Sequence, residues 1–221
     1  MILKMKLSNK FNLDKYLLLA GILALPLFVI LFWLVFPLMY PEYNLLTTGV
    51  SYLGGYESPI RTLVNVFGFG LWGVLTMMFG YGVFRSNLLK VLGKTAGIFL
   101  IIGGFMIYLV SLFQGPYESW IYTLAGQLHN FFSNYPFIPI GIAIFLFLFE
   151  FVINKRFRWL ILPIIILGPA SLYLNYQRAF PGGGLTYFGI YQRASLTLPY
   201  IIIMLIAISL YKNTNSDKEI A

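Results

Sequence analysis

The sequence contains no cysteine, which excludes disulfides, thiolate nucleophiles and cysteine-ligated metal or iron–sulfur sites. It contains one histidine, His129, and a zinc or di-metal site needs more ligands than one histidine supplies. Charged residues make up 10% of the chain, against about 25% in ordinary soluble domains. These shortages exclude an ordinary soluble domain, and we expect neither a metal nor a cofactor.

Apolar residues are abundant instead, at 59% of the chain, with aromatic residues at 19%. They form six long apolar stretches, each near the roughly 20 residues that a helix needs to cross about 30 Å of hydrocarbon. The predicted spans are residues 16–38, 62–84, 95–114, 134–153, 159–176 and 190–211. The sequence therefore predicts an all-α fold, a polytopic integral membrane bundle of six transmembrane helices.

The first stretch follows several lysines, as the apolar core of a signal peptide does. It is too long for one, however, and Phe36–Tyr40 offers no small-residue cleavage site, so we interpret it as a membrane span. The chain then divides into a basic N-terminal segment at 1–15, a six-span domain at 16–211 and a polar tail at 212–221, which we expect not to be ordered from 213 onward.

Basic residues are distributed unevenly among the connections. Of the 15 Lys and Arg residues, 12 lie in the two tails and the even-numbered connections, and only Arg61, Arg178 and Arg193 lie on the other side. By the positive-inside rule this pattern predicts a protein of the plasma membrane with both termini in the cytoplasm and three structured extracytoplasmic loops. The net charge of +8 reflects that orientation, and no basic stripe with interleaved aromatics indicates nucleic-acid binding.

Small residues and prolines modify the spans. Glycines at 68, 73, 80 and 82 in the second span and at 93, 97 and 104 in the third predict close approach of two helix backbones. Pro163, Pro169 and Pro199 each remove an intrahelical hydrogen bond, so we expect bends in the fifth and sixth spans.

Polar residues gather in the three extracytoplasmic connections and at the span ends beside them. We predict that they line a polar pocket that opens on the extracytoplasmic face. The predicted pocket residues are Ser51, Arg61, Asn65, Gln114, Glu118, His129, Asn130, Gln192 and Arg193.

Arg193 is the most informative member, because an ionisable group at membrane depth is costly and is usually paired or functional. Two interpretations stay open. Arg193 could form an ion pair with Glu118 or Glu57 that orients the helices. Alternatively, it could clamp a phosphate or carboxylate headgroup, using the bidentate geometry that lysine lacks.

A catalytic interpretation is also open. Glu118 and His129 could act as acid and base, with Ser133 or Ser51 as the nucleophile. No Gly-x-Ser-x-Gly motif and no extracytoplasmic aspartate supports it. Without strands, glycine-rich phosphate loops and dinucleotide fingerprints have no structural context.

The same segments resemble the DUF998 family of prokaryotic integral membrane proteins, a six-span group of unknown function. The resemblance rests on Ser51–Gly54 before the second span, Asn65 and the glycines after it, His129 before the fourth span, and Gly189–Arg193 at the start of the sixth. This chain departs from the family pattern at 113–116, where Phe-Gln-Gly-Pro stands in place of Phe-Pro followed by an aspartate. The resemblance implies a fold and no reaction.

We therefore expect a non-enzymatic protein that binds lipid headgroups or serves as the accessory subunit of a membrane complex. Its expected partners are membrane lipids and other membrane-protein subunits, with no nucleic acid. The alternative is a membrane-embedded hydrolase or transferase for lipid-linked substrates that uses Glu118 and His129. A transporter ranks third, because midspan charges and inverted broken helices are not evident.

Overall fold

A computed structural model describes residues 2–115, 122–179 and 187–216. Every regular element among them is a helix. Six helical segments are long and apolar enough to cross a membrane, which confirms the predicted fold class. These segments are Leu13–Met39, Arg61–Arg85, Val91–Leu112, Leu124–Ile153, Lys155–Gln177 and Phe188–Thr214.

The first two spans are each built from three consecutive pieces, of which the middle one is a π-helix. The first span contains α1 (Ile2–Phe28), η1 (Val29–Val35) and α2 (Phe36–Met39). The short 3-10 helix η2 (Val50–Gly54) follows in the connection. The second span contains α3 (Arg61–Leu63), η3 (Val64–Gly70) and α4 (Leu71–Arg85).

The remaining spans are mostly α-helical. The third is α5 (Val91–Leu112), and the fourth joins α6 (Leu124–Asn134) to α7 (Phe137–Ile153). The fifth joins the 3-10 helix η5 (Lys155–Leu160) to α8 (Ile161–Ala179), and the sixth is α9 (Phe188–Ser216). Helix α9 continues to Ser216, so the expectation of an unordered chain from 213 onward is wrong for residues 213–216.

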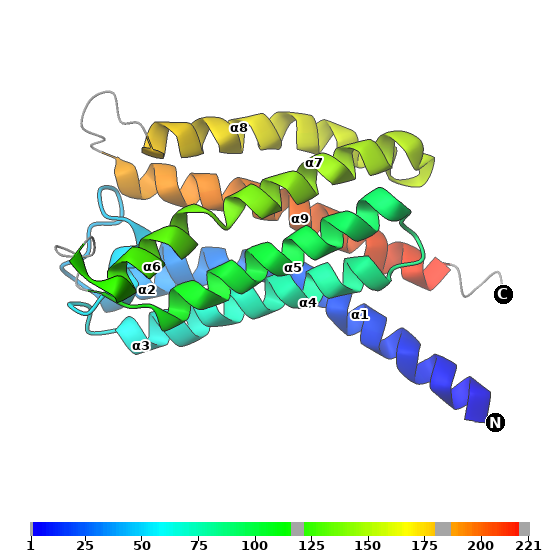
Figure 1. Ribbon diagram of the computed structural model, residues 1–221, viewed down its shortest axis with the longest axis horizontal. Coiled ribbons are helices and arrows are strands. Elements are labelled where there is room, and N and C mark those ends of the chain that lie inside the picture. The colour runs from blue at the N-terminus through cyan, green and yellow to red at the C-terminus, as the bar shows by residue number, and fades with distance from the viewer. Residues whose placement is uncertain (1, 116–121, 180–186, 217–221) are drawn as a thin grey trace.

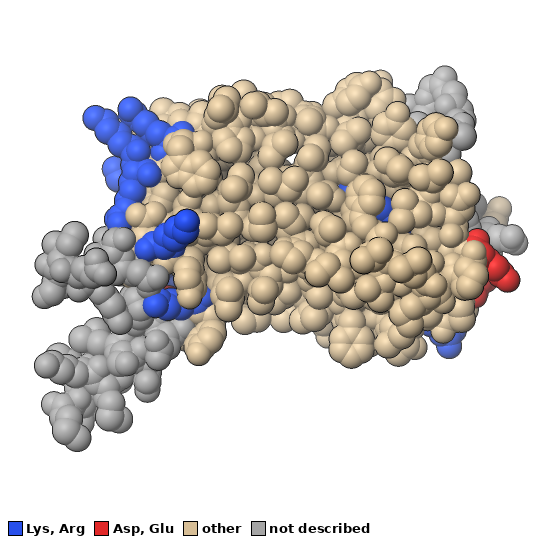
Figure 2. Space-filling model, turned by 180° about the vertical axis from the view of Figure 1, so that it is seen from behind, with Lys and Arg blue, Asp and Glu red and all other residues tan. Residues whose placement is uncertain are grey.

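Both chain termini lie at the same end of the bundle, at the right of Figure 1. We call this the terminal end, and we call the opposite end, with η2, α3 and α6, the loop end. Figure 2 shows Lys and Arg gathered at the terminal end and an acidic patch at the other, with a broad band free of exposed acids between them. Which end faces the cytoplasm stays a prediction from the basic-residue pattern.

Glycines bring α4 and α5 into backbone contact, as predicted. A Cβ atom built on Gly73 would lie 2.7 Å from the carbonyl oxygen of Gly104, and one on Gly80 would lie 2.7 Å from that of Gly97. No larger side chain fits at these four positions without separating the helices. Small residues of this kind supply the close packing that joins helices in a membrane, where apolar surface alone gives little driving force.

The prolines differ in their position. Pro169 and Pro199 lie inside α8 and α9, as predicted. Pro163 lies in the first turn of α8, directly after the 3-10 helix η5. The bends and the loss of a hydrogen bond at Pro163 stay predictions.

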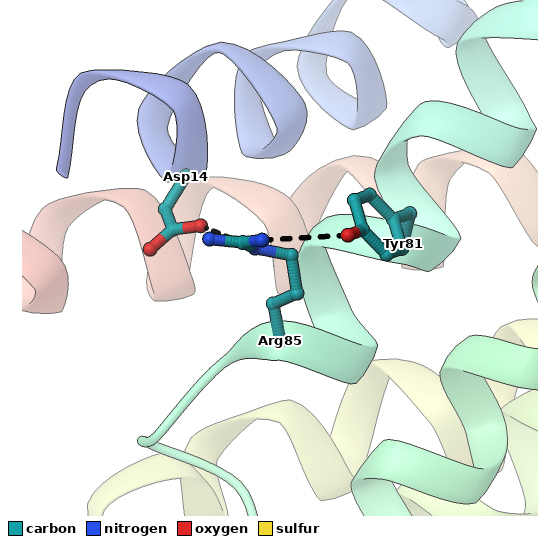
Figure 3. A network of polar contacts seen from close by, with 3 residues as sticks. All are labelled: Asp14, Tyr81 and Arg85. Carbon is teal, nitrogen blue, oxygen red and sulfur yellow. Dashed lines mark hydrogen bonds and ion pairs between the residues drawn. The ribbon is translucent and has the colours of Figure 1, made fainter. Parts of the chain in front are cut away.

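One ion pair joins described side chains. At the terminal end, Arg85 of α4 donates from Nε to Asp14 of α1 at 2.8 Å and from Nη1 to the Tyr81 hydroxyl at 3.3 Å (Figure 3). It holds the first two spans together at their basic edge.

Candidate functional site

Arg193 lies in α9 near the loop end and is completely buried. Its guanidinium donates from Nε to the carbonyl oxygen of Phe32 at 3.0 Å, and from one terminal nitrogen to those of Leu45, Thr48 and Gly189 at 3.1, 3.2 and 3.0 Å. The other terminal nitrogen donates to the Tyr43 hydroxyl. Among the described residues no carboxylate lies within ion-pair distance of it. Backbone carbonyl groups take the place of a counter-ion.

The carbonyl group of Phe32 is available because of the π-helix and the proline that follows it. In a π-helix, the N–H group of residue i+5 donates to the carbonyl group of residue i, and Phe36 N–H donates to Leu31 in this way. The equivalent donor for Phe32 would be residue 37, a proline without an N–H group. Arg193 supplies the missing donor, so a local backbone irregularity in the first span creates an acceptor for a charge in the sixth.

Residues 45–50 are fixed against the start of α9 by two further contacts. Gly189 allows this segment to approach closely, because a Cβ atom there would lie 2.6 Å from the carbonyl oxygen of Thr48. Gln192 accepts a hydrogen bond through Oε1 from the N–H group of Val50 at 2.7 Å. The sequence Gly-Ile-Tyr-Gln-Arg at 189–193 thus forms a binding surface for the chain's own loop.

Three tyrosines cover this arrangement from the loop end. The Arg193 guanidinium lies over the ring of Tyr43 at 5.3 Å from its centroid, and the rings of Tyr40 and Tyr52 stack at 6.0 Å. A hydrogen bond with Tyr52, together with burial, raises the pKa of Tyr40 to about 12. The Tyr40 phenol therefore stays neutral in this stack at physiological pH.

Asn65 fixes the 3-10 helix η2 to the second span. Its side-chain amide donates to the carbonyl oxygens of Gly54 at 2.9 Å and Arg61 at 2.8 Å, and it is 2% exposed. Ser51 lies buried in η2 beside this contact. Arg61 is exposed, and its guanidinium lies over the Tyr56 ring, so its side chain points away from the buried Arg193.

His129 lies in α6, which begins after Thr123; the Thr123 side chain caps the helix by accepting from Gly126 N–H at 3.1 Å. His129 is 1% exposed, and its Nδ1 lies 2.7 Å from the carbonyl oxygen of Phe113. Gln114, which follows Phe113, and Asn130, which follows His129, are half-buried. Glu118 falls outside the described residues, so the predicted acid–base pair stays a prediction.

A small cavity of about 20 Å³ lies near the loop end, and its wall comes from η2, η3, α4, α5, α6, α9 and the start of α7. Its polar lining residues are Ser51, Trp72, Ser133 and Gln192, and apolar residues complete the wall. Ser51 and Gln192 are the predicted pocket residues that share it. The other predicted residues that the structure describes lie outside its wall, and a single site for all nine stays a prediction.

A much larger groove of about 1060 Å³ opens between α7 and α8. Figure 1 shows these helices close together near η5 and separating toward the loop end, while α8 follows α9. Gly141 of α7 and Gly168 of α8 line the groove, and a Cβ atom on either would meet nothing within 4 Å. Its polar lining residues, Asn134, Tyr135, Ser171 and Asn175, lie toward the loop end.

The terminal half of the bundle contains a second buried charge, which sequence reasoning missed. Glu150 of α7 is 1% exposed and accepts hydrogen bonds from the backbone N–H groups of Lys90 at 2.9 Å and Gly93 at 3.1 Å. Its carboxylate thereby caps the N-terminus of α5. The signal was available, because a lone glutamate interrupts the apolar run at 137–153.

Comparison with known proteins gives a family match. The family described as "Protein of unknown function (DUF998)" matches residues 22–209, which is most of the chain. No curated protein and no solved structure matches it significantly. The match agrees with the resemblance seen in the sequence and adds no reaction.

Proposed function

We propose that this chain, which belongs to the DUF998 family, binds a membrane lipid laterally in the groove between α7 and α8. The observation that carries the proposal is the groove itself: a large, almost entirely apolar space on membrane-spanning helices, with hydrogen-bonding side chains at one end. Because α7 and α8 are membrane-spanning helices, lipid chains surround the groove.

The length of the groove fits one lipid leaflet. Its wall follows α7 from Phe137 to Leu148 and α8 from Ile164 to Asn175. Each segment rises about 17 Å at 1.5 Å per residue, close to the roughly 15 Å of hydrocarbon in half a bilayer. A lipid chain could therefore lie along the groove for most of its length.

The walls of the groove come from both helices and are largely apolar. The groove has a volume of about 1060 Å³. The exposed wall residues Ile138, Phe145 and Leu172 would contact a chain on both sides.

The polar end of the groove matches the depth at which a lipid becomes polar. Asn134 and Asn175 carry amides, Tyr135 a phenol and Ser171 a hydroxyl, and the wall contains no charged side chain. These groups suit the ester carbonyls and hydroxyls that lie between the chains and the headgroup. If the loop end faces outward, as the basic residues predict, the lipid comes from the outer leaflet.

The enzymatic alternative has less support from the described residues. A general base must come within hydrogen-bond reach of its substrate. His129 is buried, and its Nδ1 lies beside the carbonyl oxygen of Phe113. The anion-clamp interpretation of Arg193 meets a similar difficulty, because carbonyl groups already occupy its guanidinium.

The test is to fill the groove and count bound lipid. Gly141→Trp and Gly168→Trp place a large side chain where the groove is open, and the Cβ atom at either position meets no neighbour within 4 Å. We expect each to reduce, at least fivefold, the fraction of protein that retains dioleoylphosphatidylglycerol in native mass spectrometry after release from bicelles.

The matched control is Ile102→Trp, which introduces the same side chain at an exposed position of α5 outside the groove. We expect wild-type lipid retention for this variant and similar melting temperatures for all three. Equal retention in the groove variants and the control would show that lipid binds elsewhere and would refute the proposal.

A further inference from the structure

Trp72 in α4 has a buried polar group that the fold leaves without a partner. The side chain is 2% exposed, and its indole Nε1–H makes no hydrogen bond to any described residue. Its rings are held firmly, at 4.6 Å from the ring centroids of both Phe28 and Tyr200. Buried donors are nearly always satisfied, either by protein or by ordered water.

Trp72 also lines the small cavity near the loop end. The cavity measures about 20 Å³, and a space needs at least roughly 10–15 Å³ by this measure to hold one water molecule. It therefore has room for one oxygen-sized group.

The rest of the cavity wall supplies acceptors for such a group. Ser133 already donates its hydroxyl proton to the carbonyl oxygen of Asn130 at 3.3 Å, so its oxygen is left to accept. Gln192 accepts once through Oε1, from Val50 N–H, and an amide oxygen can accept twice. Ser51 provides a further hydroxyl. A water molecule needs two to four polar partners, and this wall offers one donor and several acceptors.

The cavity and the groove share one wall residue. Phe137, the first residue of α7, belongs to both walls. In the turn before it, Asn134 and Tyr135 line the groove, whereas Ser133 and Pro136 line the cavity. The polar end of the groove and the polar cavity are therefore neighbours across a single helical turn and one aromatic ring.

We propose that the cavity is a binding site for a single hydroxyl-type oxygen, which accepts a hydrogen bond from the Trp72 indole and donates to Ser133, Ser51 or Gln192. Two sources fit this chemistry: a water molecule, or the hydroxyl group of a lipid in the groove that reaches past Phe137. The second source rests on the proposed lipid-binding function, whereas the first does not.

The experiment observes the Trp72 indole N–H directly. The protein is labelled with ¹⁵N at its tryptophan indoles and placed in nanodiscs of dimyristoylphosphatidylcholine, and Trp72→Phe assigns the resonance. We expect an indole proton at a hydrogen-bonded chemical shift that shows cross-relaxation to water. A resonance at a non-bonded shift, without such cross-relaxation, would overturn the proposal.

A second arm identifies the source of the oxygen. Dioleoylglycerol, which has one free hydroxyl, is added to the same nanodiscs. Persistence of the water cross-peak assigns the site to water, whereas its replacement by cross-peaks to glycerol protons assigns it to the lipid hydroxyl. Gly168→Trp, which fills the groove, should abolish any glycerol cross-peak and leave the water cross-peak intact. The water result is therefore independent of whether lipid binds in the groove.

Discussion

Among the described residues, each half of the bundle buries one charged side chain, and the two charges are stabilised by opposite ends of the peptide group. At the loop end, the Arg193 guanidinium is surrounded by the carbonyl oxygens of Phe32, Leu45 and Gly189, among others. At the terminal end, the Glu150 carboxylate accepts from the N–H groups of Lys90 and Gly93. Neither has an ion-pair partner among the described residues.

The comparison shows how a membrane bundle accommodates an ion without a second ion. Burying an ion pair removes two charges from water, and the loss of hydration can exceed their attraction. When peptide dipoles stabilise a buried charge, only one charge is removed from water. Such a buried charge also forms hydrogen bonds with backbone groups that lack other partners. For Arg193 these groups include a carbonyl at a π-helix followed by proline, and for Glu150 they are N–H groups at the N-terminus of α5.

Arg193 should be the more sensitive of the two charges, because it satisfies acceptors from three separate segments. We expect Arg193→Leu to lower the free energy of unfolding by about 3 kcal/mol or more, since each buried acceptor left unsatisfied costs roughly 1–3 kcal/mol. Thermal unfolding in detergent, followed by circular dichroism, measures the change.

The matched control is Arg61→Leu, which removes an exposed arginine at the same end of the bundle. We expect a change within about 0.5 kcal/mol for this surface substitution. Arg193→Lys should fall between the two, because an ammonium group cannot reproduce the planar fork of donors. Similar melting temperatures for Arg193→Leu and Arg61→Leu would disprove the structural role of Arg193.

Glu150 should show a smaller effect. Glu150→Gln keeps one carbonyl oxygen for Lys90 or Gly93 and places an amide NH₂ group against the other N–H donor. We expect a loss of roughly 1–3 kcal/mol from one unsatisfied donor and from the lost attraction between the carboxylate and the helix dipole. The same thermal unfolding measurement applies.

Glu42→Gln is the control for Glu150, since Glu42 is exposed in the loop-end connection. We expect its melting temperature to match that of the wild type. A Glu150→Gln variant as stable as the control would mean that the carboxylate contributes nothing beyond a hydrogen-bond acceptor, and the parallel with Arg193 would fail.

The two charges also differ in how far the sequence predicted them. Arg193 could be singled out because an arginine at the start of an apolar span is costly. Its partners could not be predicted, because backbone carbonyl groups leave no signature in the sequence and Phe32 becomes an acceptor only through a π-helix. Glu150 carries the same signal as Arg193, but it lies outside the segments predicted to be extracytoplasmic, where the polar pocket was expected.

The fold was easier to predict than the sites. Hydropathy determines the six spans directly, and the glycines of the second and third spans predicted close backbone approach, which the structure shows between α4 and α5. The groove depends on how α7 and α8 cross, which apolar content does not encode. Gly141 and Gly168 resemble the packing glycines in sequence, but they face open space.

The ion pair between Arg85 and Asp14 should contribute least to stability, and it provides a partly exposed reference for the two buried charges. Their side chains are 23% and 26% exposed, so water already stabilises both charges (Figure 3). A double-mutant cycle of Arg85→Gln and Asp14→Asn should give a coupling of about 0–1 kcal/mol that declines as salt is added. Tyr81 keeps the Arg85 side chain in place and should contribute separately, so Tyr81→Phe is measured alongside. A coupling as large as the loss in Arg193→Leu would contradict the distinction drawn between these charges. A conventional ion pair would then stabilise the bundle as strongly as a charge enclosed by its backbone.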